Sequence, residues 1–145
     1  MVIKIDLVKV VNAPVQSVYK YFSNVEELPR RHPNHVKNIK IVSREETGLV
    51  FEQESSLIGK KLRSTNKVVL YPDQNRIETE VIEGDGKGSK TTTTIFSGAD
   101  DITQIKVEGD LHLGRLERLA SRAVKSTAEK LLNEDVKIIE SGLSE

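Results

Sequence analysis

The 145-residue sequence contains no cysteine, and this absence removes several kinds of chemistry at once. Without thiols the chain forms no disulfide, no thiolate nucleophile, no cysteine-ligated zinc site and no iron–sulfur cluster. Basic and acidic residues number 22 each, so the formal net charge is zero. A zero charge argues against a dedicated nucleic-acid-binding domain, because such domains are usually strongly basic. No apolar run approaches the ~18 residues that a transmembrane helix needs.

What is present describes an ordinary globular chain. Hydrophobic residues make up 37% and charged residues 30% of the sequence, a mixture that is typical of folded rather than disordered proteins. The length predicts a single domain over 1–145 with a core that needs no covalent staples. The first residues alternate like a strand and lack a signal-peptide cleavage site. We therefore expect a cytoplasmic protein, and no motif in it points to a cofactor or a bound metal.

The N-terminal third predicts one strand and two short helices. Residues 2–11 alternate so that Ile3, Ile5, Leu7 and Val11 share one face, which indicates a half-buried strand. Asn12-Ala13-Pro14 then ends the strand, since proline suits the first turn of a helix. Helical spacing follows over 14–23, and a second short helix is predicted over 25–31.

The middle of the chain predicts only strands. Turn signals recur roughly every 8–14 residues, as expected for antiparallel hairpins. The expected strands cover 36–42, 49–58, 62–71, 76–83, 89–97 and 102–113. Four consecutive threonines at 91–94 must place two side chains on each face of their strand.

The last part of the chain predicts one long amphipathic helix over 115–140, with apolar residues repeating at three and four. A sheet of this size must cover its apolar face, and this helix alone is large enough to do so. The fold class expected is therefore α+β. An antiparallel sheet of about seven strands curves around the C-terminal helix, in the order strand, two helices, six strands, helix.

This order and several local motifs resemble the START-like superfamily (SRPBCC), also called the polyketide-cyclase or birch-pollen-allergen-like group. The matching motifs are Asn12-Ala13-Pro14-Val15-Gln16-Ser17-Val18, Leu28-Pro29 with His32-Pro33, Tyr71-Pro72, the Gly84–Gly88 segment and the terminal helix. The resemblance implies the helix-grip fold and a cavity between sheet and helix. Members bind lipids, sterols, polyketides, quinones or hormones there, and some are cyclases or dehydratases.

Residues that would line such a cavity follow from the helix stripe and the strand faces. Small residues occupy the middle of the helix, and polar residues share strand faces with apolar ones. A buried polar side chain needs a partner, which water or a ligand would supply. The alternatives are hydrogen bonds across strands, or a register slip that reverses every face. The predicted ligand-binding residues are Phe51, Gln53, Ser55, Leu57, Ser64, Asn66, Val68, Thr79, Ala120, Ala123, Thr127 and His32.

Few ionisable residues are placed for acid–base chemistry. His32 and His35 form a His-x-x-His pair on a proline-containing loop, where they could edge the cavity or bind a metal. No third ligand lies near them in the sequence, so we predict no metal site. The alternative is a pair of exposed or locally bonded imidazoles. Asp135 lies at the edge of the helix stripe, and His112 is expected to be structural.

Basic residues also cluster locally despite the zero net charge. They could attract lipid head groups in a transient membrane contact, or an anionic partner, although a solvated face explains them equally. The clusters are Arg115, Arg118, Arg122 and Lys125 on the helix, Lys60, Lys61, Arg63 and Lys67 around one hairpin, and Arg30 and Arg31.

The function expected is therefore binding or carriage of a small hydrophobic or amphipathic ligand in the cavity, without catalysis. The first alternative is a cyclase- or dehydratase-like enzyme in the same cavity, with His32, His35 or Asp135 as its ionisable group. The second is a protein-interaction module that uses the basic helix stripe. The sequence predicts no nucleic-acid partner and no oligomeric state.

Overall fold

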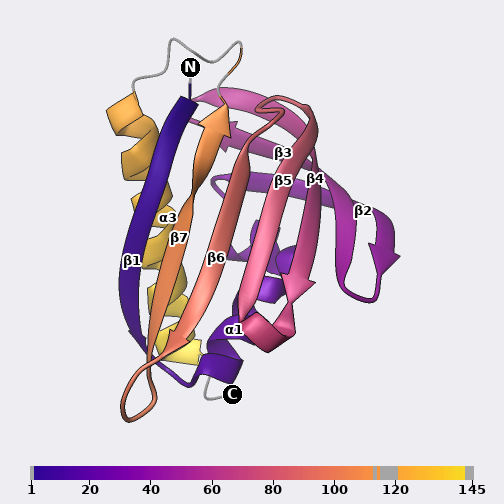
Figure 1. Ribbon diagram of the computed structural model, residues 1–145. Coiled ribbons are helices and arrows are strands. Elements are labelled where there is room, and N and C mark those ends of the chain that lie inside the picture. Colours follow the sequence, from indigo (N-terminus) through magenta and orange to yellow (C-terminus); the bar gives the residue numbers. More distant parts are fainter. Residues whose placement is uncertain (1, 113, 115–120, 143–145) are drawn as a thin grey trace.

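The fold is a seven-stranded antiparallel sheet that curls around a long helix, as the computed structural model describes it for residues 2–112, 114 and 121–142 (Figure 1). The strand order is β1-β7-β6-β5-β4-β3-β2, so β1 and β2 form the two edges. The strands are β1 (Val2–Asn12), β2 (Val36–Glu45), β3 (Gly48–Leu57), β4 (Lys60–Tyr71), β5 (Arg76–Gly84), β6 (Lys90–Ser97) and β7 (Ile102–His112).

Two short helices connect β1 to β2, and a long one follows β7. They are α1 (Val15–Ser23), α2 (Leu28–Arg31), which follows a helical turn at Val25–Glu27, and α3 (Ser121–Gly142). Pro14 precedes α1 in an extended conformation, which starts the helix where the sequence predicted. The predicted long helix ends two residues later than expected, and its expected first residues, 115–120, lie outside the described residues.

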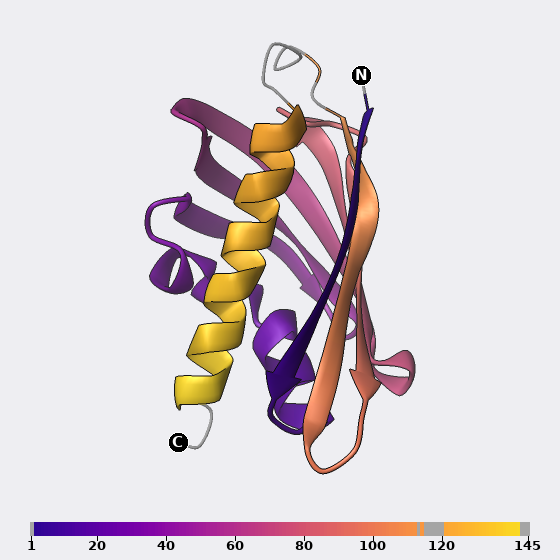
Figure 2. The same cartoon turned by 90° about the vertical axis from the view of Figure 1, so that its left-hand side faces the viewer.

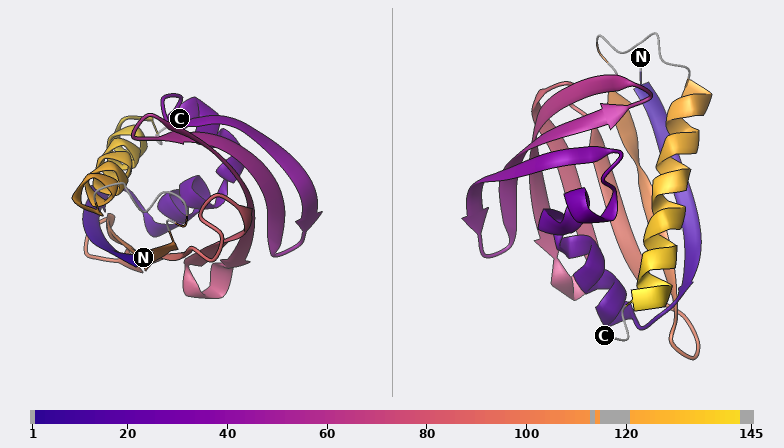
Figure 3. Two further views of the ribbon diagram at one scale, coloured as in Figure 1. Left: turned by 90° about the horizontal axis from the view of Figure 1, so that it is seen from above. Right: turned by 180° about the vertical axis from the view of Figure 1, so that it is seen from behind.

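Irregular pairing bends one half of the sheet. The register shifts twice between β2 and β3 and once between β4 and β5, at Thr65/Asn66. Such bulges bend a strand and increase its twist. Seen from above, the sheet curls round between its two edges, so that it has the outline of a deep arch (Figure 3, left).

The long helix packs mainly along one edge of this arch. Val124, Leu132 and Ile139 of α3 are buried, and they belong to core clusters that contain Ile5 and Val11 of β1. Figure 2 shows α3 running beside β1 and β7 over most of its length. The helix therefore leaves space on the side of β3 and β4, where the inner face of the sheet turns away from it.

A separate apolar cluster fills the far end of the sheet. Phe51 and Val68, which the sequence predicted as cavity-lining residues, are packed there with Leu49 and Ile77, at 2% and 1% exposure. Tyr19 and Phe22 of α1 cover this cluster. The two residues were assigned to the correct face, but α1 closes that part of the arch, so they form core instead of pocket wall.

Candidate functional site

A pocket of about 230 Å³ lies between the β3–β4 half of the sheet and α3; we call it the inner pocket. Its apolar walls come from strands on one side and from the helix on the other, as expected where α3 diverges from the sheet. The apolar wall residues are Leu57, Leu62, Val81, Leu111, Val124, Ala128 and Leu131.

One wall of the inner pocket is polar. Gln53 and Ser55 of β3 lie beside Ser64 and Asn66 of β4 along the strand pair, with Gln53 directly opposite Ser64. Asn66 is 5% exposed, and its Nδ2 donates to Ser64 Oγ at 3.1 Å. The side chains of Gln53 and Ser55 make no hydrogen bond within the described part of the chain, so their polar atoms are available to a ligand.

A second pocket, of about 500 Å³, opens between the end of α2, the β3–β4 turn and α3; we call it the lateral pocket. His35, Thr127 and Leu131 line both pockets, so the two meet at these three side chains. The remaining walls of the lateral pocket are Arg31, His32, Pro33, Asn34, Ser56, Ile58, Gly59, Lys130, Glu134, Lys137 and Ile138.

His32 is a buried polar group of the lateral pocket, and both of its ring nitrogens are bonded to α3. The residue is 5% exposed. Its Nδ1 lies 3.0 Å from Glu134 Oε1, and its Nε2 lies 2.8 Å from Asp135 Oδ1. Two carboxylates on one ring require two N–H donors, which only the imidazolium has. The arrangement fits a buried cation held between two anions.

The environment of the two histidines shifts their pKa values in opposite directions. Burial by itself lowers the pKa of His32, but the hydrogen bonds and charges of Asp135 and Glu134 outweigh it and raise that pKa above its ordinary value. Burial lowers the pKa of His35, which only a hydrogen bond to the Ser56 backbone and the charge of Glu134 oppose. His32 is therefore suited to a fixed charge, and His35 to a neutral imidazole facing the pockets.

Tyr21 extends the same network into the core. Its hydroxyl donates to Asp135 Oδ1 at 2.6 Å, and burial together with this bond raises the pKa of Tyr21 far above its usual range. Arg31 lies over the Tyr21 ring at 3.6 Å, and its Nη1 donates to the Tyr21 carbonyl at 2.7 Å. Asp135 was expected at the edge of the helix stripe; it is instead the acceptor that links α1, the end of α2 and α3.

The structure places the predicted site residues in several different environments. Gln53, Ser55, Leu57, Ser64, Asn66 and Thr127 line the inner pocket. His32 lines the lateral pocket. Thr79 pairs with Val68 and Thr91 in the sheet and borders a separate pocket over β4, β5 and β6. Ala123 lines neither pocket; its carbonyl accepts the Thr127 hydroxyl at 3.0 Å. Ala120 lies outside the described residues.

Sequence reasoning missed several residues of the pocket walls. Leu62 and Val81 share strand faces with predicted residues, so the same alternation points to them once the register is known. Leu131 belongs to the apolar stripe of the helix, and its spacing was visible, whereas Ala128 was among the small helix residues expected to form the cavity floor. No sequence pattern pointed to Asp85 as a pocket residue, because it lies in a turn. Its carboxylate accepts a hydrogen bond from the backbone N–H of Arg63 at 2.9 Å, and the two residues are 22 positions apart in the chain.

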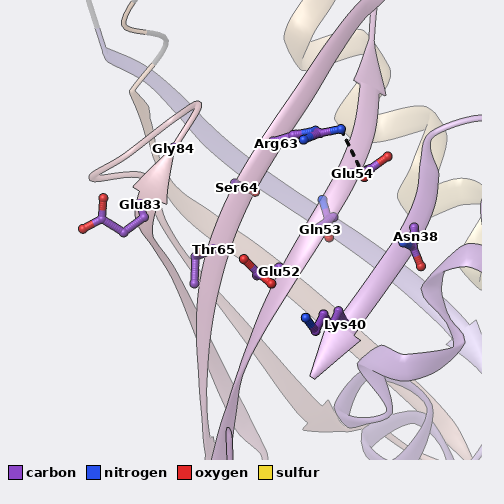
Figure 4. Close-up of a pocket in the computed structure, with 10 residues that line it drawn as sticks. All are labelled: Asn38, Lys40, Glu52, Gln53, Glu54, Arg63, Ser64, Thr65, Glu83 and Gly84. Carbon is purple, nitrogen blue, oxygen red and sulfur yellow. Dashed lines mark ion pairs between the residues drawn. The ribbon is translucent and has the colours of Figure 1, made fainter. Parts of the chain in front are cut away.

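A third concave region, of about 350 Å³, lies over β2, β3, β4 and the end of β5, and it is a different kind of surface (Figure 4). Lys40, Glu52, Glu54, Arg63 and Glu83 border it, with Arg63 Nη2 3.6 Å from Glu54 Oε1. Its charges of both signs are suited to water more than to an apolar ligand. The inner pocket is therefore the better candidate for a binding site.

The part of the chain that the structure describes offers neither a metal-binding cluster nor a membrane-spanning helix. No group of three or more His, Asp or Glu side chains there is arranged to hold a metal ion. No helix in that part of the chain is both long and apolar enough to cross a membrane. Of the predicted basic stripe, Arg122 and Lys125 are exposed on α3, whereas Arg115 and Arg118 lie outside the described residues.

Comparison with solved structures shows the fold. An aromatase/cyclase (Zhui) from a Streptomyces species superposes with a TM-score of 0.80 at 14% identity, over 99% of this chain and 94% of that chain. A START superfamily protein from Mycobacterium smegmatis superposes with a TM-score of 0.76 at 20% sequence identity, over 98% of this chain and 97% of that chain. A Thermus thermophilus protein superposes with a TM-score of 0.81 at 19% sequence identity, over 94% of this chain and 96% of that chain. No curated protein matches the chain in sequence.

The sequence itself carries a family signature over nearly its whole length. The family described as "Polyketide cyclase / dehydrase and lipid transport" matches residues 2–139, from the first strand to the last turns of α3. The resemblance expected from the local motifs, and the helix-grip fold that it implied, are thereby confirmed. The chain belongs to the family described as polyketide cyclase/dehydrase and lipid transport.

Proposed function

We propose that this protein binds a small hydrophobic or amphipathic molecule in the inner pocket and sequesters or carries it. The observation that carries the proposal is the division of that pocket into a broad apolar wall and one polar strand pair. Apolar burial of ~25 cal/mol per Å² would supply most of the affinity before binding costs are subtracted. The polar groups of Gln53, Ser55, Ser64 and Asn66 would orient the ligand.

The first experiment is native mass spectrometry of freshly purified protein, with organic extraction of any bound molecule. We expect a reproducible adduct of a few hundred daltons. The same protein, stripped of ligand, should enhance the fluorescence of the neutral probe N-phenylnaphthylamine. A clean mass together with no probe binding would contradict the proposal.

A matched pair of helix variants locates the site. Ala128 lines the inner pocket, whereas Ser126 is exposed on the same helix. Ala128→Leu adds side-chain volume to the pocket and should weaken probe binding at least about fivefold, because an added isobutyl group cannot share that space. Ser126→Leu makes a comparable change outside the pocket and should leave binding unchanged. Equal effects of the two variants would place the probe elsewhere.

The second candidate is an enzyme of the cyclase or dehydratase type in the same pocket. One observation favours it: His35 lines both pockets, and burial lowers its pKa so that the neutral, proton-accepting imidazole is favoured. The relation to an aromatase/cyclase fold agrees with this candidate. The test is turnover of a poly-β-ketone substrate. If the His35→Gln variant loses this turnover but still binds the substrate, the result would favour an enzyme over a carrier.

A further inference from the structure

The lateral pocket carries an excess of positive charge. Among its described wall residues, Arg31, Lys130, Lys137 and the His32 imidazolium are cationic, and Glu134 is the single carboxylate. Arg31 is bound to the ring and carbonyl of Tyr21. Neither Lys130 nor Lys137 takes part in an ion pair within the described part of the chain, and both are exposed at the edge of the pocket.

Glu134 lies between the two lysines on α3, yet neither lysine forms an ion pair with it or with another carboxylate that the structure describes. Lys130 precedes Glu134 by four residues and Lys137 follows it by three, which are spacings at which a helical carboxylate ordinarily pairs with lysine. Glu134 Oε1 instead lies 3.0 Å from the buried His32 ring. The neighbouring carboxylate, Asp135, is also occupied, by His32 and Tyr21. The carboxylates of this helix segment thus bond buried groups, and neither Lys130 nor Lys137 has an ion-pair partner among the described residues.

The size of the inner pocket also indicates that a ligand would extend into the lateral pocket. Sites for small molecules commonly measure ~300–1,000 Å³, and the inner pocket, at about 230 Å³, is below this range. Together with the lateral pocket it falls within it. A ligand of ordinary size would therefore extend past His35, Thr127 and Leu131 and present one end to Lys130 and Lys137.

We propose that the lateral pocket binds the anionic head group, a carboxylate or a phosphate monoester, of an amphipathic ligand whose apolar part occupies the inner pocket. This inference rests on the proposed function and names the ligand class for the same site. The lysine stems can lie along the apolar rim while the ammonium groups reach the head group. Two exposed ion pairs of ordinary strength contribute about fivefold to affinity.

Decanoate and decanol test the proposal, because they share one chain and differ in the charge of the head. Displacement of N-phenylnaphthylamine gives the affinity of each. We expect decanoate to bind about fivefold more tightly at low salt, and the difference to vanish in the double variant Lys130→Gln/Lys137→Gln. The matched control is Arg122→Gln/Lys125→Gln, which removes two cations of the same helix away from the pocket and should preserve the preference.

The outcomes separate this inference from the proposed function. Equal binding of decanoate and decanol, or loss of the preference in the control variant as well, would overturn the head-group site and leave the carrier function standing. Failure of both compounds and of the probe to bind would overturn both. Decyl phosphate forms a third arm: tighter binding than decanoate identifies a phosphate head group, and weaker binding identifies a carboxylate.

Discussion

His32 Nε2 lies 2.8 Å from Asp135 Oδ1, although 103 residues separate the two in the chain. The contact joins the end of α2 to the second half of α3, directly beside the lateral pocket. With Glu134 on the other ring nitrogen, it anchors the segment that carries His35 against the helix. The wall of the candidate site therefore depends on a charged contact as well as on apolar packing.

The first prediction concerns the strength of this contact. His32→Gln and Asp135→Asn should each lower the free energy of unfolding by about 2–3 kcal/mol, because each leaves a buried polar partner unpaired. The double variant should lose clearly less than the sum, with a coupling energy of about 1–2 kcal/mol. Urea denaturation measures all four states. The exposed pair Lys9–Glu129 is the control, and its coupling should stay below about 1 kcal/mol. Additive losses would contradict a direct bond.

The second prediction concerns pH. Because the pKa of His32 is raised on folding from 6.5, the folded chain binds more protons than the unfolded chain between 6.5 and the raised value. The contribution of His32 to stability is thus complete below pH 6.5, and it is lost as the pH rises through the pKa that His32 has in the folded protein. The charged and titratable groups packed around the ring are Asp135 and Glu134 of α3, Tyr21 of α1, Arg31 of α2 and His35 of the following loop.

His35 contributes with the opposite sign and must be separated. Its pKa is lowered on folding, so its effect destabilises the protein as pH falls below 6.5. In urea unfolding of the His35→Gln variant, the free energy of unfolding should therefore decrease as the pH rises above 6.5. The double variant His32→Gln/His35→Gln should lack that decrease. A decrease of the same size in both variants would assign the pH dependence to other groups.

The third prediction concerns the polar wall. Asn66→Leu replaces a buried amide, which among the described residues bonds Ser64 alone, with a side chain of similar size and no polar atoms. Binding of the neutral, largely aromatic probe N-phenylnaphthylamine should strengthen about threefold, since the pocket no longer holds that amide. Decanol, which carries a hydroxyl, should gain less. Asn133→Leu, an exposed change on α3, is the control and should alter neither affinity. A loss of affinity for both compounds would mean that the polar wall is not a specificity element.

The fourth prediction concerns the sheet beside the site. A Cβ on Gly109 would lie 2.1 Å from the Lys90 carbonyl oxygen and 2.7 Å from Thr91 Cα, and both are backbone atoms of β6. Gly109→Ala should therefore force β6 and β7 apart and cost about 2–3 kcal/mol. Gly142→Ala meets no atom within 4 Å and is the control. Thermal unfolding distinguishes them; equal melting temperatures would show that the sheet absorbs the methyl group.

Local sequence patterns are sufficient to predict the buried face of several strands. Alternation in residues 2–11 assigned Ile3, Ile5 and Val11 to the buried face, and the structure buries all three. The same period-2 rule placed Gln53, Ser55 and Ser64 on the inner face of β3 and β4. Thr91 and Thr93 share the face of buried Ile95, a choice that the four identical residues could not reveal, because only pairing to β5 and β7 sets the register.

The sequence by itself determined the secondary structure, its order, the family and the buried face of a strand of alternating composition such as β1, because each depends on spacing within a short segment. Tertiary structure decided which part of the inner face is pocket and which is core, since that depends on where α1 covers the sheet and where α3 leaves it. It also decided the partners of His32. A contact across 103 residues leaves no local pattern, and it forms only because the fold brings α2 against α3.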